Sequence, residues 1–382
     1  MSFLLEGILA VTWQQLVMYI VGIVLIWLAV KKEYEPSLLL PLGFGAILVN
    51  LPYSGVIDQM VQGKVPAAGI IQWLFESGIE ASEAMPILLF IGIGAMIDFG
   101  PLLSQPVLFL FGAAAQFGIF AGILIACLLG FDLKDAASIG IIGAAAGPTS
   151  ILVSQVLGSN YMGPIAVAAY SYMALVPIIQ PFAIKLVTTH KERCIHMEYN
   201  PKSVNKTLRI AFPIAVTIIV GFISPQSVAL VGFLMFGNLL RECGVLNSLS
   251  QAAQNELANI ITLLLGITIS FSMKAEQFVN PATLMIMGLG LVAFVFVTIG
   301  GVLFAKLVNV FLKMAGKNPV NPMIGGCGIS AFPMSSRVVQ KMAAEAEPGN
   351  IILMQAAGTN VSGQVASVIA GGLVISIVTQ YL

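Results

Sequence analysis

The sequence predicts an all-α polytopic membrane protein of about 10–12 membrane segments, built from two inverted-topology repeats that each carry a broken or re-entrant helical hairpin. Three observations support this fold class. Of the 382 residues, 58% are apolar and only 9% are charged, and the mean hydropathy is +0.98. The apolar runs are long and continuous, whereas the strands of a β-barrel alternate. Two halves of similar pattern flank a polar loop at residues 190–206.

The charge balance limits the functions that fit this chain. The 17 basic and 17 acidic residues give a formal net charge of zero. A nucleic-acid binder that works by charge, an acidic disordered tail and a conventional cytosolic enzyme are therefore excluded. The cysteines have no metal or redox spacing, so we expect neither a disulfide framework nor a zinc site: Cys127, Cys194, Cys243 and Cys327.

The first predicted repeat covers residues 1–188. No basic residue precedes its first apolar run, and Lys31 and Lys32 follow it, so residues 16–30 are predicted as a retained span and not a signal peptide. The stretch 65–76 is shorter, and we expect it to lie along the membrane interface or to tuck into the protein. The remaining candidate segments are 36–52, 85–99, 106–130, 136–157 and 163–188.

The second predicted repeat covers residues 207–382, after a cytoplasmic linker at 189–206. Its candidate segments are 208–224, 226–240, 257–272, 282–312, 319–340 and 351–381. The fifth segments of the two halves, 136–157 and 319–340, are the least apolar and the richest in small residues. The sixth segments each carry Ala-Ala followed by a polar pair, which ends at Tyr172 and at Asn360. The shared order of these features indicates an internal repeat.

The distribution of basic residues predicts the topology. Lys and Arg concentrate in cytoplasmic loops, so we place the central loop, with Lys191, Arg193, Lys202 and Lys206, on the cytoplasmic side. The count of crossings then requires 136–157 to enter from outside and return, with the break near the Gly-Pro at 147–148. The segment 319–340 enters from inside. Two broken segments that meet near the midplane are typical of transporters.

The two hairpins supply oxygen ligands suited to a hard cation such as Na⁺. Residues 136–184 contain no charged side chain but include Thr149 and several serines. In the second hairpin Asn321 offers a carbonyl and Ser330 a hydroxyl, and Gly325 permits a close approach. Helix packing by small residues, or an Asn-Pro turn, explains each of these residues singly. Tyr172 and Asn360 either orient a ligand or hydrogen-bond a neighbouring helix.

Arg337 follows the second hairpin, and it either snorkels to the cytoplasmic surface or binds an anion such as a carboxylate. Asp98 is predicted as a turn or cap residue at the cytoplasmic end of its span. Lys274 and Glu276 are expected at the outer interface. His190 and His196 lie in the solvated loop, where a metal role is not expected.

These motifs resemble a known family over nearly the whole chain. Residues 141–151, Ile-Ile-Gly-Ala-Ala-Ala-Gly-Pro-Thr-Ser-Ile, are similar to the signature of the β subunits of sodium-pumping biotin-dependent decarboxylases, which act with oxaloacetate, methylmalonyl-CoA or glutaconyl-CoA. The resemblance extends to Asn-Pro-Met-Ile-Gly at 321–325 and Phe-Pro-Met-Ser-Ser-Arg at 332–337. It also includes Tyr-Glu-Pro at 34–36, Leu-Pro-Leu-Gly-Phe-Gly at 40–45 and Ile-Gly-Ala-Met-Ile-Asp-Phe-Gly-Pro at 93–101.

The sequence departs from this family at one position. The family's first hairpin reads Gly-Ala-Ala-Asp-Gly-Pro-Thr, and its acidic residue binds Na⁺ and couples transport. Here that position is Ala146. The resemblance implies catalytic roles at position 146, Tyr172 and Arg337, with Arg337 toward carboxybiotin. We expect Na⁺ ligands at position 146 and at Thr149, Tyr172, Asn321, Gly325, Ser330 and Asn360.

The resemblance implies that this subunit decarboxylates carboxybiotin, consumes a proton and moves Na⁺ outward across a bacterial inner (cytoplasmic) membrane. Its expected partners are a biotin carrier, a carboxyltransferase, a small single-span membrane subunit and further copies of itself, as in a trimer. We expect Ala146 to leave folding intact and to impair coupled turnover, whether the substitution is engineered or natural. A stand-alone Na⁺-coupled carboxylate transporter and a non-catalytic anchoring subunit are the alternatives.

Overall fold

The computed structural model describes residues 2–33, 36–59, 67–81, 83–197 and 204–381. These residues are mostly helical, and the strands β1 (Asp58–Gln59) and β2 (Ala67–Ala68) form one short antiparallel ladder. The predicted all-α class is confirmed for this part of the chain. Tyr34, Glu35, Lys202 and the start of the 65–76 stretch lie outside the described residues.

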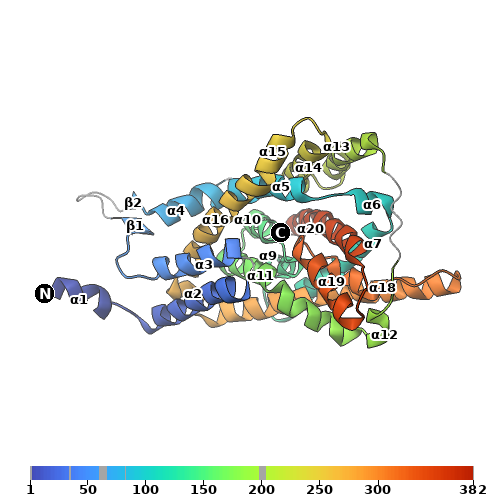
Figure 1. Cartoon of the computed structure of the whole chain (residues 1–382). Helices are drawn as coiled ribbons and strands as arrows, with labels where there is room; N and C mark the ends of the chain where they lie inside the picture. The colour runs from blue at the N-terminus through green and yellow to red at the C-terminus, as the bar shows by residue number, and fades with distance from the viewer. Residues whose placement is uncertain (1, 34–35, 60–66, 82, 198–203, 382) are drawn as a thin grey trace.

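The helices follow the predicted segments closely, with additional short turns between them (Figure 1). In the first half they are α1 (Ser2–Leu9), α2 (Trp13–Lys32), α3 (Pro36–Val49), α4 (Ile70–Phe75), η1 (Glu76–Glu80), α5 (Ala84–Met96), α6 (Gly100–Ser104), α7 (Leu108–Ala115), α8 (Phe117–Leu128), α9 (Leu133–Gly140), η2 (Ile141–Ala144), α10 (Gly147–Val156) and α11 (Met162–Val187). In the loop and second half they are α12 (His190–Arg193), α13 (Lys206–Ile223), η3 (Pro225–Ser227), α14 (Val228–Glu242), α15 (Asn247–Ala252), η4 (Ala253–Leu257), α16 (Ala258–Ile269), η5 (Ser270–Met273), α17 (Ala275–Phe278), α18 (Pro281–Met314), η6 (Pro322–Cys327), α19 (Met334–Ala346) and α20 (Leu353–Tyr381).

Seven helical segments in the described part of the chain are long and apolar enough to cross a membrane. The helices α4 and η1 form a further candidate with α5, from which they are bent by 66°. The face of α4 with Ile71 and Phe75 is buried, whereas Ile70 and Trp73 are exposed. The stretch near 65–76 therefore tucks one side into the protein. At 14 residues, α3 is shorter than a full span.

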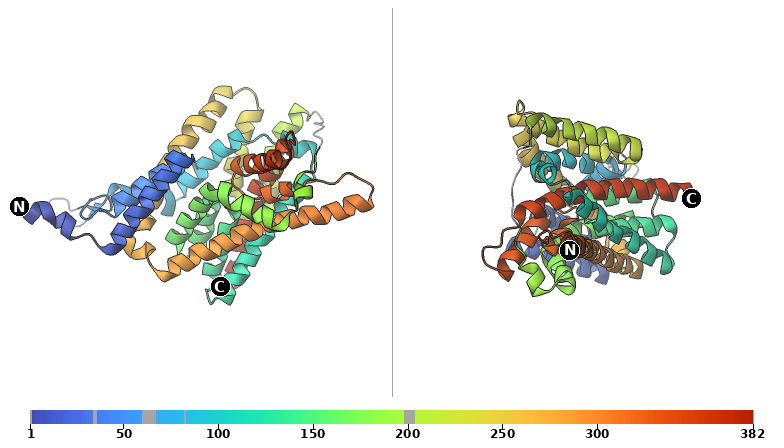
Figure 2. Two further views of the ribbon diagram at one scale, coloured as in Figure 1. Left: turned by 60° about the horizontal axis from the view of Figure 1, so that its bottom comes forward. Right: turned by 90° about the vertical axis from the view of Figure 1, so that its right-hand side faces the viewer.

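The central helices of the bundle are α11 and α20, and α2 and α13 are the most exposed of the long ones. Figure 2 shows α13 and α14 along one edge and α20 running through the middle. Packing joins the two halves crosswise, since α3 contacts α16, α5 contacts α14, α11 contacts α18, and α7 contacts α20. This exchange is compatible with two repeats, and the division into 1–188, 189–206 and 207–382 stays a prediction.

Contacts between residues far apart in the sequence show which loops and helix ends lie together at each end of the helix bundle. At one end Asn50 donates to the Met273 carbonyl at 2.9 Å and accepts from the Ala275 amide at 2.7 Å. At the other end Arg209 lies 3.6 Å from Asp98 and 3.4 Å from Glu242. Both groupings are those expected from the crossing count, which placed residues 98 and 209 on the cytoplasmic side.

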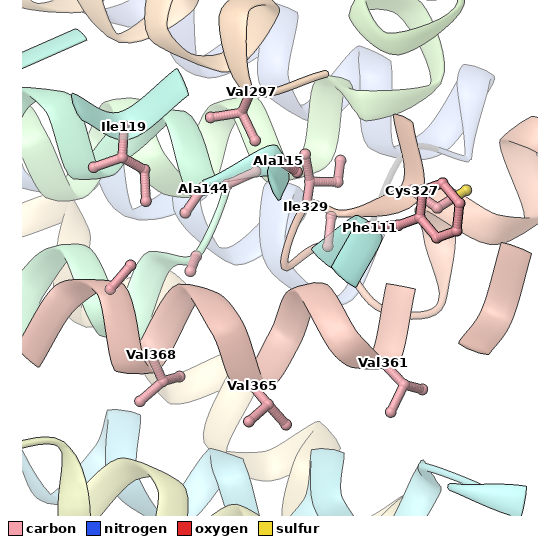
Figure 3. Packing of buried hydrophobic residues seen from close by; sticks show 14 of the residues in the cluster. Phe111, Ala115, Ile119, Ala144, Val297, Cys327, Ile329, Val361, Val365 and Val368 are labelled. Carbon is pink, nitrogen blue, oxygen red and sulfur yellow. The ribbon is translucent and has the colours of Figure 1, made fainter. Parts of the chain in front are cut away.

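The two predicted hairpins are present as broken helices that open at opposite ends of α11. The first is braced where Asp135, before the break, accepts from Ser159 at 2.8 Å and from the Asn160 amide at 3.0 Å. The second is braced where Asn321 donates to carbonyls of the central loop. Their tips meet, because the Ser330 amide donates to the Ala144 carbonyl at 2.8 Å. Figure 3 shows Ala144 and Ile329 together in the apolar cluster above the valines of α20.

Candidate functional site between the hairpin tips

A cavity of about 300 Å³ lies where the two hairpin tips meet. Both tips contribute to its wall, and α3, α5, α11, α16 and α20 close it. Apolar side chains make up most of this wall and come from α5, α16 and both tips, and α16 also contributes the polar Asn259 and Thr262. Among its lining residues are Ala145, Ala146, Pro148, Tyr170, Ser330, Arg337 and Gln364.

The first tip breaks because its backbone turns before a new helix starts. Ala145 has φ of 51°, in the left-handed region, and α10 begins at Gly147 with Pro148 in its first turn, where the missing N–H of proline costs nothing. The sequence placed the break at 147–148, and the turn itself lies two residues earlier. Gly147 is required here because a Cβ would lie 2.3 Å from the Tyr170 ring.

Ala146 occupies the N-cap position of α10 and is 3% exposed. Its carbonyl accepts from the Ser150 amide and the Ser150 hydroxyl, each at 2.9 Å. The methyl side chain cannot accept a bond from the first amides of α10. An acidic residue at an N-cap is favoured by those amides and by the helix dipole. The backbone at this position would therefore favour an acidic side chain.

The second tip presents a hydroxyl and a cation to the same cavity. Ser330 donates to Gln364 Oε1 at 2.8 Å, and Ser367 donates to Ser330 at 3.0 Å. Arg337 lies in the first turn of α19, is exposed, and makes no ion pair with a described residue. It is the one charged side chain among the described residues of the wall. Its guanidinium is free to bind a carboxylate.

Two residues predicted from the second hairpin lie outside the cavity wall. Asn321 caps η6, and its amide donates at 2.9 Å to the carbonyls of Arg193 and Ile195. Gly325 lies against the backbone of Gly301, whose carbonyl would be 2.0 Å from an added Cβ. Both residues fix the hairpin to its neighbours, and their expected role as Na⁺ ligands remains a prediction.

Tyr172 also points away from the cavity, because its hydroxyl donates to the Met287 carbonyl on α18. The cavity is lined by Tyr170, whose hydroxyl is buried without a hydrogen-bond partner among the described residues. Residues two apart on a helix point about 200° apart, so only one of these tyrosines can face the site. The sequence contained no signal that favoured Tyr170.

Thr149 and Asn360 lie next to the tips and retain free oxygens. The Thr149 methyl packs against Gly371 of α20, and Asn360 donates to the Ile329 carbonyl at 2.8 Å. Thr149 Oγ1 and Asn360 Oδ1 are buried and have no partner in the described part of the chain. Unpaired buried oxygens are costly unless a water or cation meets them.

Comparison with known proteins identifies the family. The family described as "Na+-transporting oxaloacetate decarboxylase beta subunit" matches residues 14–378. The chain belongs to this family of decarboxylase β subunits. It is 45% identical to methylmalonyl-CoA decarboxylase subunit beta of Propionigenium modestum over 97% of this chain and 96% of that protein.

Other relatives are named after different decarboxylase substrates. Glutaconyl-CoA decarboxylase subunit beta of Acidaminococcus fermentans is 45% identical over 98% of this chain and 96% of its own. Oxaloacetate decarboxylase beta chain of Klebsiella pneumoniae is 40% identical over 95% of both chains. The resemblance predicted from the motifs is confirmed, and this β subunit is a membrane component of a sodium-translocating decarboxylase. A stand-alone carboxylate transporter is not favoured.

The donor atoms of this β subunit suit Na⁺ as the transported ion. No group of three or more His, Cys, Asp or Glu that could hold a metal ion occurs among the described residues. The free oxygens at the tips belong to hydroxyl and amide groups, which are hard, neutral ligands of the kind that bind Na⁺ and Ca²⁺. The described wall of the cavity contains no carboxylate. A cation there would lack a negative partner.

Proposed function

We propose that this β subunit decarboxylates carboxybiotin and uses the reaction to move Na⁺ outward, and that Ala146 impairs the coupling. The observation that carries the proposal is the shared cavity, in which the break of one hairpin faces the free Arg337 of the other. A charge moved against 100 mV costs about 2.3 kcal/mol, so an irreversible decarboxylation is a suitable driver.

In this proposal Arg337 binds the carboxylate of carboxybiotin, which a biotin carrier delivers from the central-loop side. The N–CO₂⁻ bond breaks, CO₂ leaves, and the ring nitrogen takes up a proton. Apolar side chains of α5 line the same cavity, and the guanidinium binds the carboxylate by charge-assisted, bidentate hydrogen bonds. Arg337 thereby positions the carboxylate that leaves as CO₂.

Sodium would bind beside the tips, at the oxygens of Ser330, Thr149 and Asn360. A cation in a membrane interior needs a compensating negative charge. With Ala146 that charge is missing, so we expect weak Na⁺ binding and severely reduced coupled turnover.

The partners and the membrane belong to the same proposal. We expect a carboxyltransferase, a biotin carrier and a small single-span subunit, several copies of this chain such as a trimer, and a bacterial cytoplasmic membrane. The upstream acid or acyl-CoA is set by the carboxyltransferase, since the relatives with different substrates share this subunit.

The test is uptake of radioactive sodium into inverted vesicles, driven by carboxybiotin on its carrier. This chain is compared with Ala146→Asp and with Ala145→Asp, a control that places a carboxylate one residue earlier in the same wall. The proposal is supported if the Ala146→Asp variant takes up sodium and neither the unchanged chain nor Ala145→Asp does. Normal uptake by the unchanged chain overturns the impairment. Sodium uptake that requires a dissolved dicarboxylate in place of carboxybiotin overturns the decarboxylase function.

A further inference from the structure

The broken tip of the second hairpin satisfies its backbone carbonyls with side-chain amides. Four consecutive carbonyls, at Gly326, Cys327, Gly328 and Ile329, accept from three side chains. Gln180 Nε2 lies 2.9 Å from the Gly326 carbonyl, and Gln116 Nε2 lies 2.9 Å from the Gly328 carbonyl. Asn360 Nδ2 donates to the carbonyls of Cys327, at 3.3 Å, and Ile329, at 2.8 Å. The donors come from α11, the α7–α8 junction and α20.

The orientation of the two glutamine amides follows from their surroundings. Gln116 Nε2 also lies 2.9 Å from the Gly112 carbonyl, and a carbonyl can only accept. Gln180 Nε2 also donates to the Ser335 hydroxyl at 2.6 Å. Both glutamines are buried, at 4% and 0% exposure. A buried carbonyl without a donor is costly, so these amides compensate for the hydrogen bonds that the break removes.

The first hairpin is held differently. Its Ala144 carbonyl accepts from the Ser330 amide, and its Ala146 carbonyl accepts from Ser150 within α10. Among the described residues no side chain of another helix donates to these two carbonyls. The second tip is therefore fastened by side-chain amides of three helices, whereas the first tip packs against α18 and α8 and is joined to the second by the hydrogen bond from Ser330 to Ala144.

We propose that Gln116 and Gln180 are positioning residues that fix the second tip and thereby hold Ser330 and Arg337 at the cavity. The catalytic part of this inference rests on the proposed function above. The structural part does not, because it concerns only how firmly the tip is held. Neither glutamine lines the cavity.

Cys327 reports on the tip directly. It is fully buried between Gly326 and Gly328, whose carbonyls accept from the two glutamines, and its thiol lies 3.7 Å from the Ser335 carbonyl. A thiol in this position reacts with maleimide only when the tip opens locally, so the labelling rate measures that opening. Replacing Cys127, Cys194 and Cys243 with Ser leaves Cys327 as the single thiol.

In that background we would compare N-ethylmaleimide labelling of the folded full chain with Gln116→Met, Gln180→Met and Gln340→Met. Gln340 is the matched control, since it lies on the same hairpin and donates at its mouth to the Asn350 carbonyl at 3.0 Å. We expect about tenfold faster labelling for the first two variants and no change for the third. Unchanged labelling in both tip variants, or an equal increase in all three, overturns the proposal.

If a Met variant does not accumulate, the corresponding Gln→Asn variant, which keeps the amide but shortens its reach, is judged by the same criterion. The catalytic arm uses the Ala146→Asp chain. There we expect the tip variants to raise the KM for Na⁺ by about tenfold while kcat changes less. A loss of kcat with unchanged KM overturns the catalytic part. The labelling experiment does not require turnover. It therefore still tests whether the glutamines hold the second tip, even if the proposed function is wrong.

Discussion

At the scale of single residues, Arg337 combines a permanent charge, an exposed position and the absence of any ion pair with a described residue. The proposed carboxylate ligand would supply the missing partner. Charge-assisted hydrogen bonds contribute about 1.5–3 kcal/mol, so losing them corresponds to about ten- to a hundredfold in binding.

In the Ala146→Asp chain we therefore expect Arg337→Gln to raise the KM for carboxybiotin by about ten- to a hundredfold. Arg337→Lys should recover part of the loss, because lysine keeps the charge without the bidentate geometry. The measurement is CO₂ release from the charged carrier. Lys341→Gln is the control, since Lys341 is exposed on the same helix but outside the cavity wall. An equal loss in Lys341→Gln would indicate general attraction of the carrier.

Some residues of the candidate site could be predicted from the sequence and others could not. Position 146, Ser330 and Arg337 were predicted, and the structure brings them to one cavity. Tyr170 and the two glutamines were missed. Apolar periodicity and motif spacing do not tell which of two helical positions 200° apart faces inward, and they carry no signal for a long-range amide contact.

At the scale of elements, the hairpins depend on close backbone approach. Gly325 on η6 and Gly301 on α18 face each other, and an added Cβ at either would lie 2.0–2.1 Å from the other's carbonyl oxygen. The sequence predicted that Gly325 allows a backbone or an ion to come close, and the structure supplies the backbone. It also predicted both breaks, because Gly and Pro cluster there. It could not predict the partner helix, which depends on tertiary packing.

Gly325→Ala should therefore destabilise the folded chain strongly, because backbone atoms on both sides have to shift. Gly288→Ala is the matched control on α18, since nothing lies within 4 Å of an added Cβ there. Alanine is also a better helix former than glycine by up to about 1 kcal/mol, so the control should be neutral or slightly stabilising. Thermal unfolding in detergent measures both. Equal melting temperatures for the two variants would contradict this packing argument.

At the scale of the whole molecule, the two hairpins open at opposite ends of the bundle and meet by their tips. The central loop, Arg209, Arg241 and Lys317 belong to the end of the second hairpin in the predicted topology, and basic residues concentrate on the cytoplasmic side. The sequence predicted opposed hairpins from the positions of its basic residues and the number of crossings, and the inverted orientation of the two halves stays a prediction. The absolute orientation follows from the distribution of basic residues.

Sidedness can be tested with single cysteines at the two mouths, in a chain with the four native cysteines replaced. Leu129→Cys lies at the entry to the first hairpin and Lys317→Cys at the entry to the second, and both positions are exposed. A membrane-impermeant maleimide should label position 129 in intact cells and position 317 in inverted vesicles. Because α18 and α8 each lead directly into a hairpin, the two labels report where the hairpins open. Labelling of both positions from one face would show that the hairpins enter from the same side, and would remove the alternating access that two opposed hairpins allow.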